Sequence, residues 1–288
     1  MATTSTVQIQ PSGAALGADI SAVDIGRDID RPAMDAILAA WSDHLVLRFR
    51  RQTLSDNQLV AFSRRFGTLD LAPITTTGKP WLPEYPELNV ISNVIDDNGR
   101  PIGGLGAGES EWHTDMSYKA EPPSASILYS LEVPAAAGNT EFSNMYLAAE
   151  ELPADLRSAI TGRLCKHDSS MNSTGQLRKN FAPVTDPRDA PGVAHPMLRT
   201  HPVTKRTALF LGRRKNAYIV GLPLTDSEAL LDRLWAHATQ TRYVWQQNWR
   251  VGDLIIWDNR CVMHRRDAFD PNLRRVLHRA QVAGDKPF

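Results

Sequence analysis

The stretch DLIIWDNRCVMHR, residues 253–265, decides the fold: an apolar run enters a polar turn, and a second short run leads to His264. A short apolar run bounded by turn residues is typical of a buried β-strand. Similar runs occur along the chain as HLVLRFR (44–50), ELNVISNV (87–94), SASILYSLEV (124–133), TALFLG (207–212), RYVWQQNWR (242–250) and RRVLHRAQVA (274–283). The sequence therefore predicts many short strands, as in a jelly roll or a barrel.

Helices are predicted around these strands. In residues 31–41, the apolar residues at positions 34, 37, 38 and 41 follow the spacing of one helical face. Ser55 and Gln58 have the spacing of a capping box, and Gly67 is expected to end the helical run that follows them. Further helices are expected near 145–161 and at 225–240. Helices grouped early and strands later predict the α+β class.

The chain shows no repeat and no low-complexity tract, and its prolines and glycines are scattered rather than pooled in a linker. We therefore expect a single domain over residues 1–288. Residues 165–192 are polar and interrupted by prolines, which predicts a long surface loop. A long loop in a compact domain often covers a site, so we expect this segment to be an active-site lid.

Composition excludes several classes of partner. Lys+Arg and Asp+Glu are equal at 32 each, so no basic excess indicates a nucleic-acid partner. No segment approaches the ~18 uninterrupted apolar residues of a membrane span, and the N-terminus lacks the pattern of a signal peptide. Cys165 and Cys261 fit neither a disulfide framework nor a cysteine-rich zinc site. We expect a cytoplasmic protein without a membrane or nucleic-acid partner.

The stretch EWHTDMSY (111–118) places His113 and Asp115 two positions apart in a segment that reads as a strand. Side chains two apart on a strand project to one face, so an imidazole nitrogen and a carboxylate oxygen are expected to converge. A second imidazole from His264 completes a set of two histidines and one carboxylate. This set leaves coordination positions open and suits Fe(II) better than structural zinc.

A pair of the form HxD occurs by chance in many proteins, and a lone histidine usually has a structural role. His195 and His201 each precede a proline, which favours capping or turn roles for both. The contexts of the four remaining histidines indicate no metal role either: His44, His167, His237 and His278.

Arg275 and Arg279 lie in the last strand-like run and share a face if that run is extended. Two arginines on an inward face need anions, because an unpaired buried charge costs several kcal/mol. Guanidinium groups match carboxylates in geometry. An Fe(II) oxygenase of this type needs an electron source, and a 2-oxo acid that chelates the metal leaves its distal carboxylate for one arginine to bind. The other arginine is then free for an anionic substrate. The alternative is that Arg274 and His278 face inward instead.

The order of several motifs resembles one known family, the Fe(II)/2-oxoglutarate-dependent dioxygenases of the taurine dioxygenase and 2,4-dichlorophenoxyacetate dioxygenase group. The resemblance covers most of the chain, through GALGADI, SDNQLVAFSRRFG, WHTD, GNTEF, LRTHPVTKRTALFLG, WDNRCVMH and HRAQVAGDKPF. It implies a double-stranded β-helix, which is a cupin-like jelly roll with flanking helices, and an oxidoreductase that uses Fe(II), 2-oxoglutarate and O2. It also implies a homo-oligomer.

The resemblance assigns roles to individual residues by motif. His113, Asp115 and His264 match the iron ligands. Arg275 and Thr140, the latter in GNTEF, match the residues that hold 2-oxoglutarate. With Asp115 present, hydroxylation rather than halogenation is expected.

The substrate is less clearly indicated. Arg279 matches the arginine that pairs with the acidic group of the substrate. Three positions that contact taurine in the taurine enzyme are matched here by Ala72, Thr75 and Glu109, which disfavours taurine itself. Glu109 is expected to contact the substrate. Arg213, with Arg214 and Lys215, either adds positive potential at the site mouth or forms a solvated turn.

Three functions follow from these patterns. The first is a dioxygenase that hydroxylates a small anionic molecule, an aryloxyalkanoate-type carboxylic acid, with ether cleavage and release of succinate and CO2. The second is a dioxygenase of alkyl sulfonates or sulfate esters. The third is a non-catalytic jelly-roll module that binds a metal or an anion, which the joint presence of Arg275 and Thr140 disfavours.

Overall fold

The computed structural model describes residues 7–75 and 77–288. Its largest sheet has eight strands and is antiparallel except where β2 pairs with β3 and β4 pairs with β5. In spatial order the strands are β1 (Gln8–Pro11), β2 (Ala18–Ser21), β3 (Val46–Phe49), β15 (Leu254–Asp258), β7 (Ala125–Glu132), β17 (Val276–Val282), β4 (Asn89–Ser92) and β5 (Gly104–Leu105). The stretch DLIIWDNRCVMHR contains β15, which lies near the centre of this sheet.

A second sheet has four strands, in the order β14 (Val244–Gln247), β8 (Thr140–Asn144), β16 (Val262–Arg266) and β6 (Ser110–His113). Its register places His264 of β16 opposite His113 of β6 on one side and opposite Phe142 of β8 on the other. Pairing of strands far apart in sequence therefore brings two histidines together.

The main hydrophobic cluster joins both sheets. Leu128 and Trp257 of the large sheet pack in one cluster with Phe142 and Met263 of the smaller sheet. Each sheet buries one face against the other, as a two-layer β architecture requires. The predicted combination of a jelly-roll β part with flanking helices is therefore what the sequence builds.

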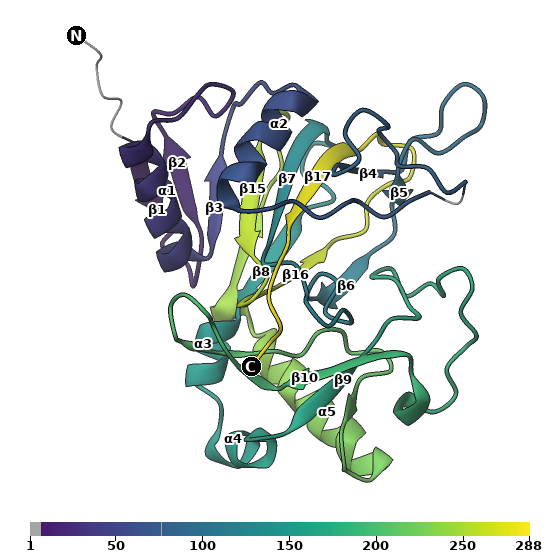
Figure 1. Cartoon of the computed structure of the whole chain (residues 1–288). Coiled ribbons are helices and arrows are strands. Elements are labelled where there is room, and N and C mark those ends of the chain that lie inside the picture. Colours follow the sequence, from purple (N-terminus) through teal and green to yellow (C-terminus); the bar gives the residue numbers. More distant parts are fainter. Residues whose placement is uncertain (1–6, 76) are drawn as a thin grey trace.

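Two helices, α1 (Arg31–His44) and α2 (Asp56–Ser63), lie beside the large sheet (Figure 1). Ile37 and Trp41 of α1 are buried in a cluster with residues of the large sheet. The predicted capping box is confirmed, because Ser55 and Gln58 each bond the backbone of the other. The helical run ends at Gly67, as predicted. Its φ is +143°, and an added Cβ there would lie 2.7 Å from Val282.

The remaining elements form the part of the molecule drawn in green and teal below the sheets (Figure 1). The helical region predicted for 145–161 is two helices, α3 (Met145–Glu150) and α4 (Ala154–Ile160), separated at Pro153. Proline cannot donate a helical hydrogen bond, and it disfavours helical geometry at the residue before it. The helix predicted at 225–240 is α5 (Leu224–Ala238). Small sheets pair β10 (Gly192–Pro196), β9 (Leu164–Asp168) and β13 (Tyr218–Ile219), and β11 (Leu198–Thr200) with β12 (Thr207–Leu209).

The segment predicted as a loop over 165–192 needs one correction. Its first residues belong to β9, which pairs antiparallel with β10 from Asp168 opposite Gly192 to Leu164 opposite Pro196. The local sequence around β9 is polar and did not predict a strand. The strand forms because it pairs with β10 and β13. The connection between β9 and β10, residues 169–191, contains one short 3-10 helix at Pro187–Asp189.

None of the helices in the described part of the chain is long and apolar enough to cross a membrane.

Candidate metal centre and active site

His113 is the last residue of β6, and the chain turns immediately after it. The prediction that His113 and Asp115 share one strand face is therefore wrong in its geometry. Thr114 donates its backbone N–H to Gly212 O at 2.9 Å, and Met116 adopts a positive φ of 47°. The turn nevertheless brings the two side chains together, with 3.6 Å between His113 Nε2 and Asp115 Oδ1.

His264 completes the predicted group. The ligand atoms of His113, Asp115 and His264 all lie within 4.8 Å of one another, and the three side chains are buried. The ring of His264 packs against Trp257, with the ring centroids 4.7 Å apart, which makes Trp257 a packing residue of this site.

The protonation states of these side chains suit a divalent metal. His113 Nδ1 lies 2.7 Å from the carbonyl of Glu111, so Nδ1–H donates and Nε2 is the ring nitrogen that is left for a metal. Burial, followed by the proximity of His113, lowers the pKa of His264 well below its usual value. Burial raises the pKa of Asp115, but Arg279 and His113 outweigh it and hold that pKa well below its usual range.

Two imidazoles and one carboxylate therefore present nitrogen and oxygen atoms without a thiolate. This donor set is the one that non-heme Fe(II) oxygenases use. The residues present fit an Fe(II) ion.

Three side chains hold the Asp115 carboxylate through four hydrogen bonds. Ser126 Oγ donates to Oδ2 at 2.7 Å, and Gln281 Nε2 donates to the same oxygen at 3.2 Å. Arg279 Nη1 lies 3.2 Å from both oxygens. Sequence reasoning missed Ser126 and Gln281, because each lies on a strand of the large sheet that the sequence alone does not place beside Asp115. Together these contacts fix the orientation of the carboxylate.

Asn259 holds the backbone of the same residue. Its Oδ1 accepts the N–H of Asp115 at 2.9 Å, and its Nδ2 donates to the carbonyls of Asp115 and Pro123, each at 2.9 Å. The amide is buried, and it links the turn before β16 to the turn after β6. Asn259 therefore fixes the carboxylate ligand relative to the strand that carries His264.

Replacing Asn259 by Ala is expected to weaken metal binding by roughly 10- to 100-fold, the usual cost of losing an outer partner of a metal ligand. The measurement is calorimetric titration with Mn(II), and Asn272→Ala is the control because Asn272 bonds only within its own turn at Asp270. Equal Mn(II) affinity in the Asn259 variant and the control would contradict this positioning role.

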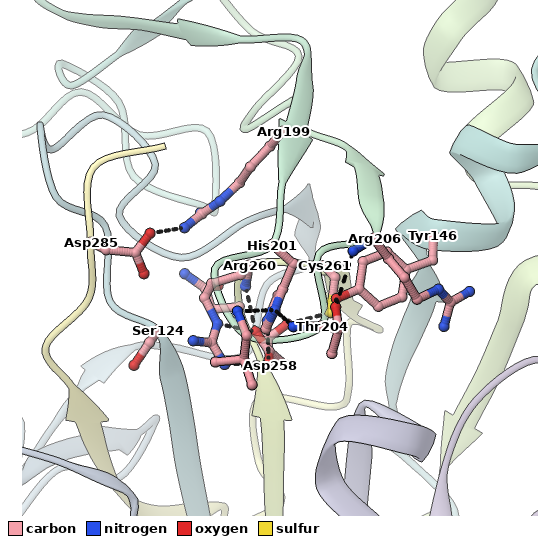
Figure 2. Close-up of polar contacts among 12 residues, drawn as sticks. Ser124, Tyr146, Arg199, His201, Thr204, Arg206, Asp258, Arg260, Cys261 and Asp285 are labelled. Atoms are coloured by element: carbon pink, nitrogen blue, oxygen red, sulfur yellow. Dashed lines mark hydrogen bonds and ion pairs between the residues drawn. The ribbon is translucent and has the colours of Figure 1, made fainter. Parts of the chain in front are cut away.

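A second group of potential ligands, His201, Asp258 and Cys261, lies at the β15–β16 turn (Figure 2). His201 Nδ1 accepts the backbone N–H groups of Val203 and Thr204, at 3.2 and 3.1 Å. Its Nε2 lies 3.0 Å from Asp258 Oδ2, so Nε2–H donates. Both ring nitrogens are thus occupied, and the predicted turn role of His201 is confirmed.

The other members of this second group are equally unavailable to a metal. Arg260 binds Asp258 through two parallel bonds, Nε to Oδ1 at 2.9 Å and Nη2 to Oδ2 at 2.7 Å. Burial, reinforced by Asp258, raises the pKa of Cys261 well above its usual value, so it remains a thiol. The side chains of the network in Figure 2 therefore bond one another and support the turn that carries Asn259.

A second cluster of side chains, which is positively charged, lies in a cavity that His113 and His264 also line. The cavity is lined from both sheets by Ile91, Leu128, Trp257, Arg275 and Arg279 of the large sheet and its flanks, and by His113, Thr140, His264 and Arg266 of the smaller one. Arg275 immediately precedes β17, and it lines the cavity together with Arg279. The predicted inward pair is therefore observed. Arg274 is exposed and binds Glu132.

Arg275 is 2 % exposed, and its side chain makes no ion pair or hydrogen bond with residues 7–75 or 77–288. Its guanidinium lies 5.9 Å from the rings of Trp249 and Phe269. Trp249 Nε1 donates to Thr140 Oγ1 at 3.0 Å, which leaves the hydroxyl hydrogen of Thr140 free to donate.

A second buried arginine strengthens the positive potential. Arg266 donates to the carbonyls of Leu105 and Gly108 and has no carboxylate partner in the described part of the chain. Burial, followed by the charge of Arg266, lowers the pKa of Arg275 to about 9, so Arg275 is still charged at neutral pH. Two buried cations without a protein anion indicate a built site for a carboxylate ligand.

The structure does not bring every predicted residue to the cavity. Glu109 is exposed on 56 % of its side chain and pairs with Arg265 at 3.4 Å. It is not among the residues that line the cavity. Ala72 and Thr75 line neither this cavity nor the adjoining one that contains Asp115, whereas their neighbour Pro73 lines the adjoining one.

The run Arg213, Arg214 and Lys215 divides between the two expected roles. Arg213 lines an adjoining cavity together with Asp115 and Arg279, and Arg279 belongs to the lining of both cavities. Arg214 instead binds Glu228 and Asp232 of α5, at 2.7 and 2.6 Å. One residue of the run therefore adds positive potential to the site.

Mild acid is expected to destabilise the metal-free fold through its buried neutral histidines. The pKa of His264 is far below its usual value, and burial lowers the pKa of His167 to about 3. The unfolded chain binds these protons near pH ~6.5 while the fold excludes them, so the free energy of unfolding falls as the pH falls. The loss is about 1 kcal/mol per histidine between about pH 6.5 and 5.5.

Urea titrations at pH 7.5, 6.5 and 5.5 measure this slope, and His44→Gln, at the end of α1, should leave it unchanged. A free energy of unfolding that stays constant through this range would show that the folded protein protonates both rings.

Comparison with known families assigns the chain. Residues 8–281 match the family model described as taurine catabolism dioxygenase TauD, TfdA family. The chain belongs to the TauD/TfdA family. It is an Fe(II)- and 2-oxoglutarate-dependent dioxygenase, with O2 as the second co-substrate, and its fold is the family's double-stranded β-helix.

Three relatives of this TauD/TfdA protein show the range of the family. It is 34% identical over 286 residues to the α-ketoglutarate-dependent 2,4-dichlorophenoxyacetate dioxygenase of Cupriavidus pinatubonensis, covering 97% of this chain and 99% of the relative. A taurine dioxygenase structure from Burkholderia xenovorans superposes with a TM-score of 0.80 at 32% identity, covering 98% of this chain and 91% of the other. The structure of AAD-2 with Mn(II) and N-oxalylglycine gives 0.78 at 28%, covering 98% and 99%. Relatives named for different substrates are thus almost equally similar.

Proposed function

We propose that this dioxygenase hydroxylates a small anionic substrate, an aryloxyalkanoate-type carboxylic acid, at the carbon that bears the ether oxygen. The observation that carries the proposal is the position of Arg279. Its guanidinium reaches the cavity beside Asp115, and the surrounding lining includes the apolar residues Ile91, Leu105 and Leu128. An apolar cavity with one charged group next to the metal ligands suits an aromatic acid.

The residues of this chain take the following roles in the proposal. His113, Asp115 and His264 hold the iron, which supplies the redox chemistry with O2 and 2-oxoglutarate. Arg275 and Thr140 bind the distal carboxylate of 2-oxoglutarate, because both face the cavity with donors that no described protein acceptor uses. Arg266 adds to the positive potential around that carboxylate.

Arg279 has two tasks in this proposal. It keeps Asp115 ionised, and it offers its remaining donors to the acidic group of the substrate. Its fixed position relative to Asp115 places the carbon next to that acidic group near the iron. Hydroxylation at an ether carbon gives a hemiacetal, which collapses to a phenol and a carbonyl compound.

We further propose that the chain forms a single domain. Residues 169–191 are proposed to cover the active-site cavity. Asn172, Ser173 and Arg178 of this connection contribute to the lining near Asp115. Cys165 and Cys261 are free thiols, which fits the predicted cytoplasmic location. The predicted homo-oligomer stays a prediction.

The test is succinate formation from 2-oxoglutarate, with Fe(II) and ascorbate under air, across aryloxyalkanoic acids, alkyl sulfonates and alkyl sulfates. We expect succinate to form in step with phenol release from the aryloxyalkanoates. Phenoxyacetamide is the matched control, because it lacks only the charge and should stimulate little turnover. Turnover with sulfonates or sulfates alone would replace the proposed substrate class by the alternative one.

A further inference from the structure

The backbone of Arg213 is fixed to the metal-binding segment. Gly212 has a φ of +69°, and an added Cβ there would lie 2.3 Å from His167 Nδ1, so only glycine fits this turn. The turn lets Gly212 O accept the N–H of Thr114 at 2.9 Å and pairs Arg213 with His113 in an antiparallel bridge. Arg213 therefore cannot move away from the iron site without breaking these contacts.

The side chain of Arg213 is only partly satisfied. Its Nη1 donates to Met171 O at 2.6 Å, and its Nε is buried without a hydrogen-bond partner. Its guanidinium lies 5.6 Å from the ring centroid of Tyr118. Among the residues that the structure describes, no carboxylate pairs with Arg213.

A second arginine lies near the same aromatic ring. Arg178, in the connection between β9 and β10, stacks over the same Tyr118 ring at 4.2 Å. It also has no carboxylate partner within residues 7–75 and 77–288. Burial, followed by the charge of Arg178, lowers the pKa of Arg213 to about 10. The two cations therefore repel each other across a partly buried space.

Both arginines line one cavity with Asp115, Tyr118 and Arg279. Asp115 is the one acidic residue in that lining, and it is committed to the iron. A substrate with a single anionic group paired to Arg279 would leave Arg178 and Arg213 without a counter-charge. Unpaired charges that are removed from water are costly. The presence of Arg178 and Arg213 beside the iron site therefore points to a ligand anion.

We infer that the substrate carries a second anionic group, which Arg213 and Arg178 bind at the Tyr118 side of the cavity, away from the group that Arg279 binds. The ligand class is a small organic dianion, such as an aryloxyalkanoate or an alkyl sulfate ester with an additional carboxylate. This inference rests on the proposed function and narrows its substrate class.

The test measures binding to protein that is loaded with Mn(II) and N-oxalylglycine and therefore does not turn over. Two matched pairs of probes are titrated by calorimetry: phenoxyacetate against 4-carboxyphenoxyacetate, and hexyl sulfate against 6-(sulfooxy)hexanoate. In at least one pair we expect the dianion to bind about tenfold more tightly or better, which corresponds to about 1.4 kcal/mol. The preference should weaken as salt increases.

Variants of Arg213 and Arg178 test which residues bind the second anionic group of the substrate. Arg213→Met is expected to reduce the dianion to the affinity of its monoanionic partner, and Arg178→Gln to remove part of the preference. Arg214→Gln is the matched control, because Arg214 binds Glu228 and Asp232 on α5 and should leave the preference intact. Circular dichroism melting checks that each variant folds, and Arg178, on the β9–β10 connection, tests the inference if Arg213→Met does not fold.

Equal affinity within both pairs, no binding by either dianion, or a preference that survives both variants would each overturn the inference. Its failure is distinguishable from failure of the proposed function. Succinate formation with monoanionic aryloxyalkanoates tests that function, whereas the binding of dianions to the Mn(II)-loaded protein tests the subsite.

Discussion

Replacing His113 by Ala is expected to remove measurable succinate formation and to abolish tight binding of Fe(II). His113 supplies one of three ligand atoms that lie within 4.8 Å of one another, and its Nδ1–H bond to Glu111 presets the tautomer that binds metal. Loss of a ligand must cost more than the roughly 10- to 100-fold that loss of an outer partner costs.

The measurement combines calorimetric titration with Mn(II) and succinate formation at saturating 2-oxoglutarate. His44→Gln, a change at the last residue of α1, is the control and should retain both properties. A His113 variant that turned over 2-oxoglutarate at the rate of the unmodified protein would disprove the metal assignment.

Replacing Arg275 by Gln is expected to weaken the binding of 2-oxoglutarate and to stabilise the ligand-free fold. The KM for 2-oxoglutarate should rise by roughly a hundredfold, because two charge-assisted hydrogen bonds to a carboxylate contribute about 3 kcal/mol. The melting temperature of the ligand-free protein should rise, since the variant no longer buries an unpaired charge beside Arg266. A residue that merely filled space would destabilise the protein when replaced.

Arg274→Gln separates these effects from a general loss of positive charge. Arg274 is the adjacent residue, but it is exposed and pairs with Glu132 at the surface. The control should change neither KM nor melting temperature by much. If both variants raised KM equally, the carboxylate site would not be at Arg275.

Much of the site could be predicted because the residues that carry its chemistry lie in short, recognisable sequence motifs. His113, Asp115 and His264 were identified as residue types that together bind Fe(II), and Arg275 and Arg279 as cations that need anions. The capping box of Ser55 and the end of its helix at Gly67 were also predictable, because capping depends on residues within one turn. These features involve local geometry or the chemistry of the side chain itself.

Other features depended on contacts between distant segments. The strand expected to carry both His113 and Asp115 ends at His113, since Thr114 bonds to Gly212. Glu109 was expected at the substrate and instead pairs with Arg265. The strand at the start of the predicted loop formed because β10 and β13 pair with it. Pairing partners of this kind are not encoded by local pattern.

The sequence by itself determined which residues could hold iron and carboxylates, and which segments had the patterns of helix or strand. Only the tertiary structure decided how these parts meet. Asn259 holds the backbone of Asp115 by hydrogen bonds, and the register of β16 places His264 opposite His113. The turn at Gly212 places Arg213 beside His113. The physical reason is that strand register and turn packing minimise the free energy of the whole chain, so a residue's neighbours across the fold, rather than those along the sequence, fix where its side chain points.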